Sequence, residues 1–225
     1  MTALVEVNNI SKSFESFLAV DDINFSLEKG EVLGFLGPNG AGKTTTMRIL
    51  TGFLKPSSGS IKINGLDLFK NLKKAREFIG YVPEGSPLYN EMTTIDFLSF
   101  ICEIRNIDKG QNLSKIIKLL NLDEVLLQKI DTLSKGFKRR VGLAQALVHD
   151  PKILILDEPT DGLDPNQKHE VRKLIKKLGK EKSIIISTHI LEEVKAICNR
   201  TMILSNGKLL IDDTPINVLK KSSSY

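Results

Sequence analysis

Short apolar runs alternate along the chain with longer stretches in which apolar residues recur every three or four positions. Residues 32–36 are almost entirely apolar, which is typical of a strand covered on both faces of a sheet. Apolar or alternating patterns predict further strands at residues 4–7, 23–27, 61–63, 79–82, 152–156, 183–187 and 202–212. Because predicted helices separate many of these strands, the pattern favours an α/β fold with a mainly parallel sheet.

Helical periodicity is strongest in the middle of the chain, where strand patterns are almost absent. Apolar residues spaced for one helical face are Ile95, Leu98, Ile101 and Cys102, followed by Leu113, Ile116, Ile117 and Leu120. We therefore predict an inserted helical subdomain at about residues 87–147. Two more helices are expected at about residues 43–51 and from Pro165 onward, and Asn64-Gly65 and Asn206-Gly207 predict tight turns between strands.

Composition places the chain among soluble globular proteins. It has 225 residues, of which 41% are hydrophobic and 26% charged. No apolar run approaches the roughly eighteen residues that a membrane-spanning helix needs, and the N-terminus has no secretory pattern. We expect a cytoplasmic protein that reaches a membrane only through a partner.

The net charge of +5 comes partly from lysine-rich stretches at residues 70–74 and 168–182. These are interpreted as solvated helix faces, with phosphate steering or contact with an anionic membrane surface as the alternatives. Cys102 and Cys198 lack neighbouring metal ligands, so they are expected to be buried, reduced thiols.

A phosphate-binding loop is the most specific motif in the sequence. Residues 37–44, Gly-Pro-Asn-Gly-Ala-Gly-Lys-Thr, fit the pattern G-x-x-x-x-G-K-[ST] between a buried strand and a helix. Glycines let successive amides point at phosphate oxygens, and the start of the helix adds a positive dipole end. Lys43 can supply a charge for the β- and γ-phosphates, and the Thr44 hydroxyl can ligate Mg²⁺.

Two acids end a later apolar strand. Asp157 and Glu158 follow residues 153–156, and a parallel strand beside the phosphate loop would bring Asp157 to the Mg²⁺ shell. Glu158 could then polarise the water that attacks the γ-phosphate. Between the two motifs, Ser134 is expected to cap a cationic helix, which by itself is a weak signal.

In this order, the motifs resemble those of the ABC (ATP-binding cassette) ATPases over nearly the whole chain. They comprise the phosphate loop from Gly37, a signature at Ser134, the acids at 157–158, the stretch 159–164 and His189. Residues 143–160 are most similar to ATPase subunits of bacterial drug and lipid exporters. The resemblance implies one α/β domain over residues 1–225, with a P-loop NTPase core, an N-terminal antiparallel β portion and the helical subdomain within it.

The resemblance also implies roles for individual residues. Glu158 would be the general base, and His189 would contact the γ-phosphate and orient that base. Phe14 would stack on adenine beside Val20, although Phe17 is a rival and Phe14 could simply pack in the core. The phosphates of ATP would be held by Gly37, Pro38, Asn39, Gly40, Ala41, Gly42, Lys43, Thr44 and Thr45, and Mg²⁺ by Thr44, Glu84 and Asp157.

Three further residues would act between two copies of the chain. Ser134 and Gly136 would bind the ATP held by the opposite subunit, and Asp164 would lie in the loop that crosses the interface. The expected working unit is a head-to-tail homodimer or pseudo-symmetric dimer with two ATP molecules at its interface. His149 and His169 match no motif and are interpreted as structural.

Two positions depart from the family pattern. Glu84 replaces the usual glutamine, which adds a negative charge near the γ-phosphate and predicts hydrolysis that is sensitive to Mg²⁺ concentration. Lys135 and Phe137 replace the common glycine and glutamine of the signature. Lys135 could offset Glu84 across the interface or could point to solvent.

The function expected from this resemblance is to power a transporter through a separate membrane-spanning permease, with export favoured over import. The chain would then lie on the inner face of the cell membrane. A soluble ABC mechanoenzyme would usually have two cassettes or long heptads, and a scaffold that barely hydrolyses ATP would not need Glu158 and His189. A GTPase would carry Asn-Lys-x-Asp, which is absent. No direct contact with nucleic acid is expected.

Overall fold

The structure is a computed structural model and describes residues 3–85, 87–108 and 110–222. Its larger sheet has six strands in the order β10-β9-β3-β8-β7-β6. The pairs from β9 through β6 are parallel, and β10 joins the edge as an antiparallel hairpin partner of β9. The strands are β3 (Val32–Leu36), β6 (Ile79–Val82), β7 (Ile153–Asp157), β8 (Ser183–Thr188), β9 (Arg200–Ser205) and β10 (Lys208–Asp213).

A smaller antiparallel sheet has the order β2-β1-β4-β5. Its strands are β1 (Val5–Phe14), β2 (Phe17–Leu27), β4 (Ser58–Ile63) and β5 (Leu66–Asp67). The strand predicted at residues 4–7 continues much further, because Phe14 ends β1 and pairs with Phe17 across the turn. The polar residues before Phe14 hid the strand in the sequence, since register shifts between Val7 and Ser13 break the simple alternation.

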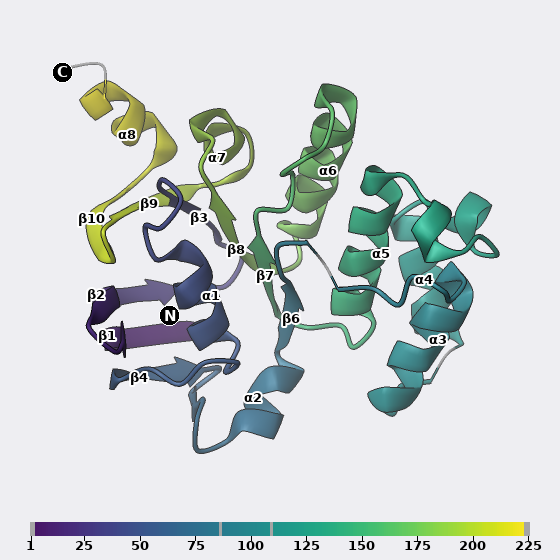
Figure 1. Ribbon diagram of the computed structural model, residues 1–225, viewed down its shortest axis with the longest axis horizontal. Coiled ribbons are helices and arrows are strands. Elements are labelled where there is room, and N and C mark those ends of the chain that lie inside the picture. Colours follow the sequence, from purple (N-terminus) through teal and green to yellow (C-terminus); the bar gives the residue numbers. More distant parts are fainter. Residues whose placement is uncertain (1–2, 86, 109, 223–225) are drawn as a thin grey trace.

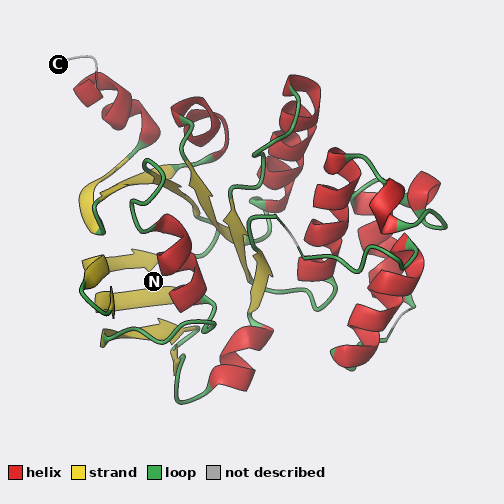
Figure 2. Cartoon of the chain, viewed as in Figure 1, coloured by secondary structure: helices red, strands yellow, loops and turns green. Residues whose placement is uncertain are grey.

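Helices cover both faces of the larger sheet (Figure 1). The helices outside the middle region are α1 (Lys43–Leu50), α2 (Leu72–Glu77), α6 (Pro165–Leu178), α7 (Leu191–Ile197) and α8 (Pro215–Ser222). The middle region contains α3 (Thr94–Ile104), α4 (Gln111–Leu119) and α5 (Lys135–Leu147), with 3₁₀ turns at Asp123–Val125 and Ile130–Thr132. The predicted helical region is confirmed, and Figure 2 shows it as a block of helices beside the strands.

The larger sheet has a hydrophobic core on each face, because successive side chains of its central strands point to opposite faces. Leu154 and Leu156 of β7 pack with the helical region, α5 and α6, whereas Ile153 and Ile155 pack with α1 and the small sheet. The helical region therefore buries its apolar face against the larger sheet, in the same core, and is not an independently packed unit.

Local turn chemistry agrees with the sequence. Asn64-Gly65 and Asn206-Gly207 both have positive φ angles, of 48° and 78° in the first pair and 48° and 77° in the second. Positive φ angles at both residues are typical of the tight turns that join β4 to β5 and β9 to β10. Among the described residues, none of the helices combines the length and the hydropathy needed to cross a bilayer.

Candidate functional site

The glycine-rich loop connects the end of β3 to the start of α1, so its amides lie at the carboxyl edge of the parallel strands. Gly42 has φ 97° and is the N-cap residue of α1. A Cβ atom there would lie 2.6 Å from the Ala19 carbonyl oxygen, and one at Gly37 would lie 2.3 Å from the Leu204 carbonyl oxygen. Both positions require glycine because the backbone is packed too closely for any side chain.

The loop borders a cavity of about 330 Å³. Most of the predicted phosphate-binding residues line it, together with residues from four other segments: Phe17, Ala19, Asn39, Gly40, Ala41, Gly42, Lys43, Thr44, Thr45, Glu84, Glu158, Asp161 and His189. The cavity is therefore built from the β1–β2 hairpin, the glycine-rich loop and the ends of β6, β7 and β8.

Lys43 is almost completely buried beneath this loop. Its ammonium group donates to the carbonyl oxygens of Gly37 at 2.7 Å and Pro38 at 3.1 Å, and lies 3.4 Å from Glu158 Oε1. Gly37 and Pro38 thus contribute backbone oxygens that hold the lysine, whereas the residues after them line the cavity. A buried ammonium beside a loop of backbone amides can bind a phosphate group.

Asp157 is fully buried at the end of β7. Its Oδ1 accepts hydrogen bonds from the Ser187 hydroxyl at 2.5 Å and from the Thr44 hydroxyl at 3.3 Å. Its Oδ2 is buried and has no hydrogen-bond partner. A buried carboxylate oxygen without a donor is costly unless a cation completes it, so the pair Thr44 and Asp157 fits a hard, oxygen-preferring ion such as Mg²⁺.

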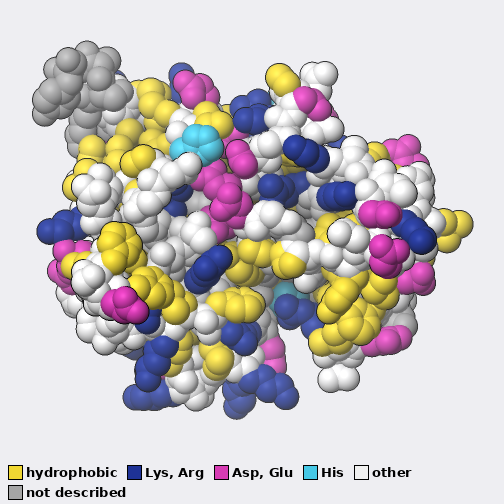
Figure 3. Space-filling view, viewed as in Figure 1, with side chains coloured by type: hydrophobic (Ala, Val, Ile, Leu, Met, Phe, Trp, Pro, Cys, Tyr) yellow, Lys and Arg dark blue, Asp and Glu magenta, His cyan; other side chains and the backbone are white. Residues whose placement is uncertain are grey.

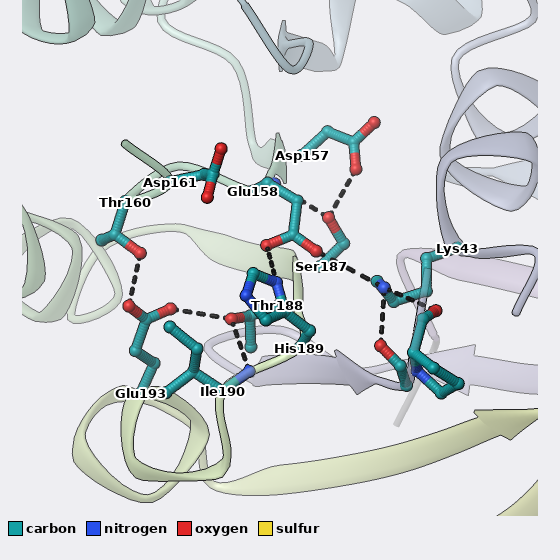
Figure 4. Close-up of polar contacts among 12 residues, drawn as sticks. Lys43, Asp157, Glu158, Thr160, Asp161, Ser187, Thr188, His189, Ile190 and Glu193 are labelled. Atoms are coloured by element: carbon teal, nitrogen blue, oxygen red, sulfur yellow. Dashed lines mark hydrogen bonds and ion pairs between the residues drawn. The ribbon is translucent and has the colours of Figure 1, made fainter. Parts of the chain in front are cut away.

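Glu158 lies next to Lys43 and His189 (Figure 4). Its backbone has φ 46°, and its amide donates to the Ser187 hydroxyl at 2.9 Å. Glu158 Oε2 lies 3.1 Å from His189 Nδ1. The left-handed backbone conformation is uncommon for a glutamate and turns this side chain toward the loop.

The carboxylate of Glu193 is hydrogen-bonded to the two segments that carry Glu158 and His189. Glu193 of α7 accepts hydrogen bonds from the hydroxyls of Thr160 and Thr188, at 2.6 Å and 2.7 Å, and Lys168 lies 3.9 Å away (Figure 4). Thr160 follows Glu158 by two positions, and Thr188 directly precedes His189. In the view of Figure 3, acidic side chains gather near the centre of the molecule, below a histidine.

The two residues predicted to contact the base, Phe14 and Val20, are not among those that line the cavity. Phe14 does not line the cavity; it lies beside the Lys12 ammonium, 5.2 Å from the ring centre, and lines a different cavity with Arg48 and Phe53. Phe17, the rival to Phe14 in the sequence, is 62% exposed and lines the cavity. Val20 is fully buried in the core, and its neighbour Ala19 lines the cavity instead, because successive strand residues face opposite sides.

The residues predicted to act across an interface lie outside the cavity of their own chain. Ser134 is the N-cap residue of α5 and accepts from the Phe137 amide at 3.3 Å. Gly136 is buried, and a Cβ atom there would lie 3.1 Å from the Gln167 side chain. Asp164 is the N-cap residue of α6, where it accepts from the amides of Asn166 and Gln167, both at 2.9 Å.

Four residues of the site were not predicted from the sequence. Ala19 and Asp161 line the cavity, and Ser187 and Glu193 hydrogen-bond to residues around it. Ser187 could have been found from topology, because it is paired with Asp157 in the parallel register of β7 and β8. Glu193 gave no such signal, since an acid in the first turn of an amphipathic helix is usually solvated. His149, which matches no motif, lies with its Nε2 2.9 Å from the Ile79 carbonyl oxygen.

A parallel sheet with a glycine-rich loop, a buried lysine and a strand-ending pair of acids defines a P-loop nucleoside triphosphatase. The family model described as ABC transporter matches residues 20–161. The chain belongs to this family and is an ATP-binding, ATP-hydrolysing subunit of an ABC transporter.

Relatives of known sequence and structure agree with this assignment. The bacitracin transport ATP-binding protein BcrA of Bacillus licheniformis is 39% identical over 98% of this chain and 72% of its own length. An uncharacterized ABC transporter ATP-binding protein, YhcH of Bacillus subtilis, is 40% identical over 93% of this chain and 70% of its own. The structure of CbiO1 from Clostridium perfringens, part of the ABC transporter complex CbiONQ, superposes with a TM-score of 0.89 at 30% identity, covering 100% of this chain and 93% of that one.

Proposed function

We propose that this chain powers export through a separate membrane-spanning subunit, and that two copies hydrolyse ATP at a shared interface. The observation that carries the proposal is the buried group of Lys43, Asp157 and Glu158 at the glycine-rich loop. Lys43 and Glu158 line the cavity, and Asp157 accepts a hydrogen bond from Thr44, which also lines it. Such an arrangement of buried charges is expensive to maintain and serves phosphate binding and cleavage.

In the proposed mechanism, the amides of the glycine-rich loop and Lys43 bind the phosphates of ATP. Thr44, Asp157 and Glu84 would hold Mg²⁺, which when bound offsets negative charge on the phosphate oxygens. Support for Asp157 comes from its unpartnered Oδ2, and support for Glu84 comes from its position in the cavity wall.

Glu158 would accept the proton of the attacking water, and His189 would orient it. The 3.1 Å approach between Glu158 Oε2 and His189 Nδ1 supports this pairing. Lys43 is positioned to move between Glu158 and a phosphate, because its ammonium already lies within 3.4 Å of the carboxylate.

The second copy would contribute Ser134, Gly136 and the loop containing Asp164. Ser134, Gly136 and Asp164 do not line the cavity of their own chain, which is what a head-to-tail dimer requires. The start of α5, capped by Ser134, would then face the γ-phosphate of the opposite subunit.

A second cavity supports docking of a membrane-spanning subunit. It has a volume of about 660 Å³ and combines aromatic side chains with arginines. The rings of Phe14 and Phe53 are exposed and that of Tyr81 is partly buried, and the arginines are Arg48, Arg76 and Arg105. In Figure 3, apolar side chains also gather on the viewed face, with lysine and arginine side chains between them. CbiO1 is described as part of a transporter complex, and we extend that assembly to this chain.

The direction of transport is proposed from relatives. BcrA is named for bacitracin transport, LnrL of Bacillus subtilis for linearmycin resistance, and YbhF of Escherichia coli for probable multidrug transport. These names favour export of a drug-like compound. The chain would then act on the inner face of the cell membrane, held there by the permease.

The decisive experiment replaces the proposed base. Glu158→Gln should lower turnover by a factor on the order of 10² to 10⁴ while retaining ATP, so that dimers accumulate in gel filtration with ATP. Lys43→Ala is the matched control and should lose ATP affinity and remain monomeric. If Glu158→Gln stays monomeric in saturating ATP, the shared-interface mechanism is wrong for this protein.

A further inference from the structure

Glu193 is a buried acid that the proposed chemistry does not use. It lies in the first turn of α7 and is 3% exposed. Burying a carboxylate is unfavourable unless hydrogen bonds or a counter-charge compensate, so its surroundings indicate what retains it.

Both oxygens of Glu193 are occupied by short hydrogen bonds. Oε1 accepts from the Thr160 hydroxyl at 2.6 Å, and Oε2 accepts from the Thr188 hydroxyl at 2.7 Å. Thr188 Oγ1 in turn accepts from the Ile190 amide at 3.1 Å. The Lys168 ammonium, from α6, lies 3.9 Å from Oε1 and supplies the nearest opposite charge.

The two threonines flank the pair that would activate water. Thr160 lies two residues after Glu158, on the segment that continues to Asp161 in the cavity wall. Thr188 immediately precedes His189, so the Glu193 carboxylate joins the segment of the base to the segment of the histidine (Figure 4). Its two hydrogen bonds therefore connect the two segments whose side chains make the 3.1 Å contact between Glu158 and His189.

We propose that Glu193 is a positioning residue for ATP hydrolysis, holding His189 at its working distance from Glu158 by anchoring Thr160 and Thr188 together. The inference rests on the proposed roles of Glu158 and His189. Because Thr160 begins the 160–164 loop, which would contact the second copy, its hydrogen bond to Glu193 also couples the position of that loop to the distance between Glu158 and His189. The carboxylate is suited to this task because it accepts from two hydroxyls at once.

The test is Glu193→Gln in the full chain, assayed with ATP and Mg²⁺. The carboxamide has one acceptor oxygen, so it can hold one threonine as before and must turn its NH₂ group toward the other. We expect kcat to fall about ten- to hundredfold, with KM and the thermal midpoint nearly unchanged, because small displacements of a catalytic group have effects of this size.

Glu31→Gln is the matched control. Glu31 is also largely buried, and it accepts from the Glu28 amide at 2.8 Å and from Arg200 at 3.2 Å. It precedes β3, at the opposite end of the sheet from the cavity, and its replacement should leave kcat unchanged. A similar loss of kcat in both variants would indicate general destabilisation and overturn the inference.

A double-mutant cycle with His189→Ala separates positioning from simple packing. If Glu193 acts through His189, Glu193→Gln should cause little further loss in the His189→Ala background. Unchanged kcat in Glu193→Gln, or additive losses in the cycle, would overturn the inference. Should Glu193→Gln fail to fold, Thr160→Val and Thr188→Val remove one hydroxyl each and should lower kcat in the same non-additive way.

These outcomes are distinguishable from failure of the proposed function. If Glu158→Gln abolishes turnover and Glu193→Gln does not change it, only the positioning role is lost. If Glu158→Gln retains full turnover, the assigned base is wrong and the positioning role falls with it.

Discussion

At the scale of single residues, buried charge separates the site from the rest of the molecule. The charged side chains that are buried within the described part of the chain are Lys43, Arg139, Asp157, Glu158 and Glu193. Four of them form the cavity or the network behind it, and Arg139 lies 3.5 Å from the Asp161 carbonyl oxygen. Because burying a charge is costly unless partners compensate it, this concentration favours a functional over a packing origin.

Glu84 provides a test of metal binding at this scale. Its carboxylate lines the nucleotide cavity where the family pattern has a glutamine. Since a carboxylate binds Mg²⁺ more strongly than an amide, Glu84→Gln should raise the Mg²⁺ concentration for half-maximal hydrolysis by about two- to tenfold. Titrating Mg²⁺ at fixed ATP measures the shift, and an unchanged Mg²⁺ dependence would exclude Glu84 from the metal site.

His149 predicts how stability depends on pH. Burial, with a smaller contribution from Arg105, lowers the pKa of its imidazole from 6.5 to about 4. As the pH falls, the unfolded chain therefore binds a proton at His149 before the folded chain does. The contribution of neutral His149 to the free energy of unfolding is complete above pH 6.5 and is lost as the pH falls toward 4. Urea midpoints of His149→Gln should fall less steeply over that window than those of the parent protein, whereas His169→Gln, on the exposed surface of α6, should follow the parent.

At the scale of elements, helix caps place the interface residues. Ser134 and Asp164 each begin a helix, and their side chains accept from the free amides of the first turn. The same helix starts can present positive dipole ends to a ligand of a second copy. Capping and the proposed interface role are therefore compatible at Ser134, whereas the hydrogen-bonded Oδ1 of Asp164 is already used within its own chain.

Asp164→Ala tests the capping role. Loss of two accepted hydrogen bonds at the start of α6 should lower the free energy of unfolding by about 1 kcal/mol. For a chain of this size, that corresponds to a fall of roughly 2–4 °C in the thermal midpoint. Asp164→Asn keeps the capping oxygen and should retain most of the stability; equal losses in both variants would show that the charge matters instead of the cap.

At the scale of the whole molecule, one hydrophobic core joins the helical region to the sheet. Leu143 of α5 and Leu98 of α3 belong to the same buried cluster as Leu154 and Leu156 of β7. The cluster extends across the sheet to Ile184 and Ile186 of β8. Helices that bury their apolar faces against these strands depend on the sheet for stability, so the helical region and the nucleotide site should unfold together.

Leu143→Ala tests this coupling. Removing this fully buried side chain should lower the free energy of unfolding by about 2–5 kcal/mol. The urea concentrations at which the helices and ATP hydrolysis are lost should then both fall, and to the same value. Far-UV circular dichroism and turnover measure the two transitions. Leu127→Ala, at an 83% exposed position in the same region, should change stability by less than about 0.5 kcal/mol. Helix loss well before loss of turnover would mean that the two parts are independent.

The sequence alone determined the features whose geometry is set by adjacent residues. The glycine-rich loop, the apolar strands and the Asn-Gly turns are such features, because neighbouring backbone angles and side-chain alternation define them. The motif residues from Asn39 to Thr45, with Glu158 and His189, were predicted for the site and line one cavity. Their assigned roles remain predictions for the experiments above.

Tertiary structure decided what depends on the pairing of distant segments. The parallel register of β7 and β8 brings Ser187 beside Asp157, and the β1–β2 hairpin places Phe17 in the cavity wall. The packing of α7 buries Glu193 between Thr160 and Thr188. No local pattern encodes these contacts, because strand register and helix packing are fixed by the summed burial of many residues far apart in the chain.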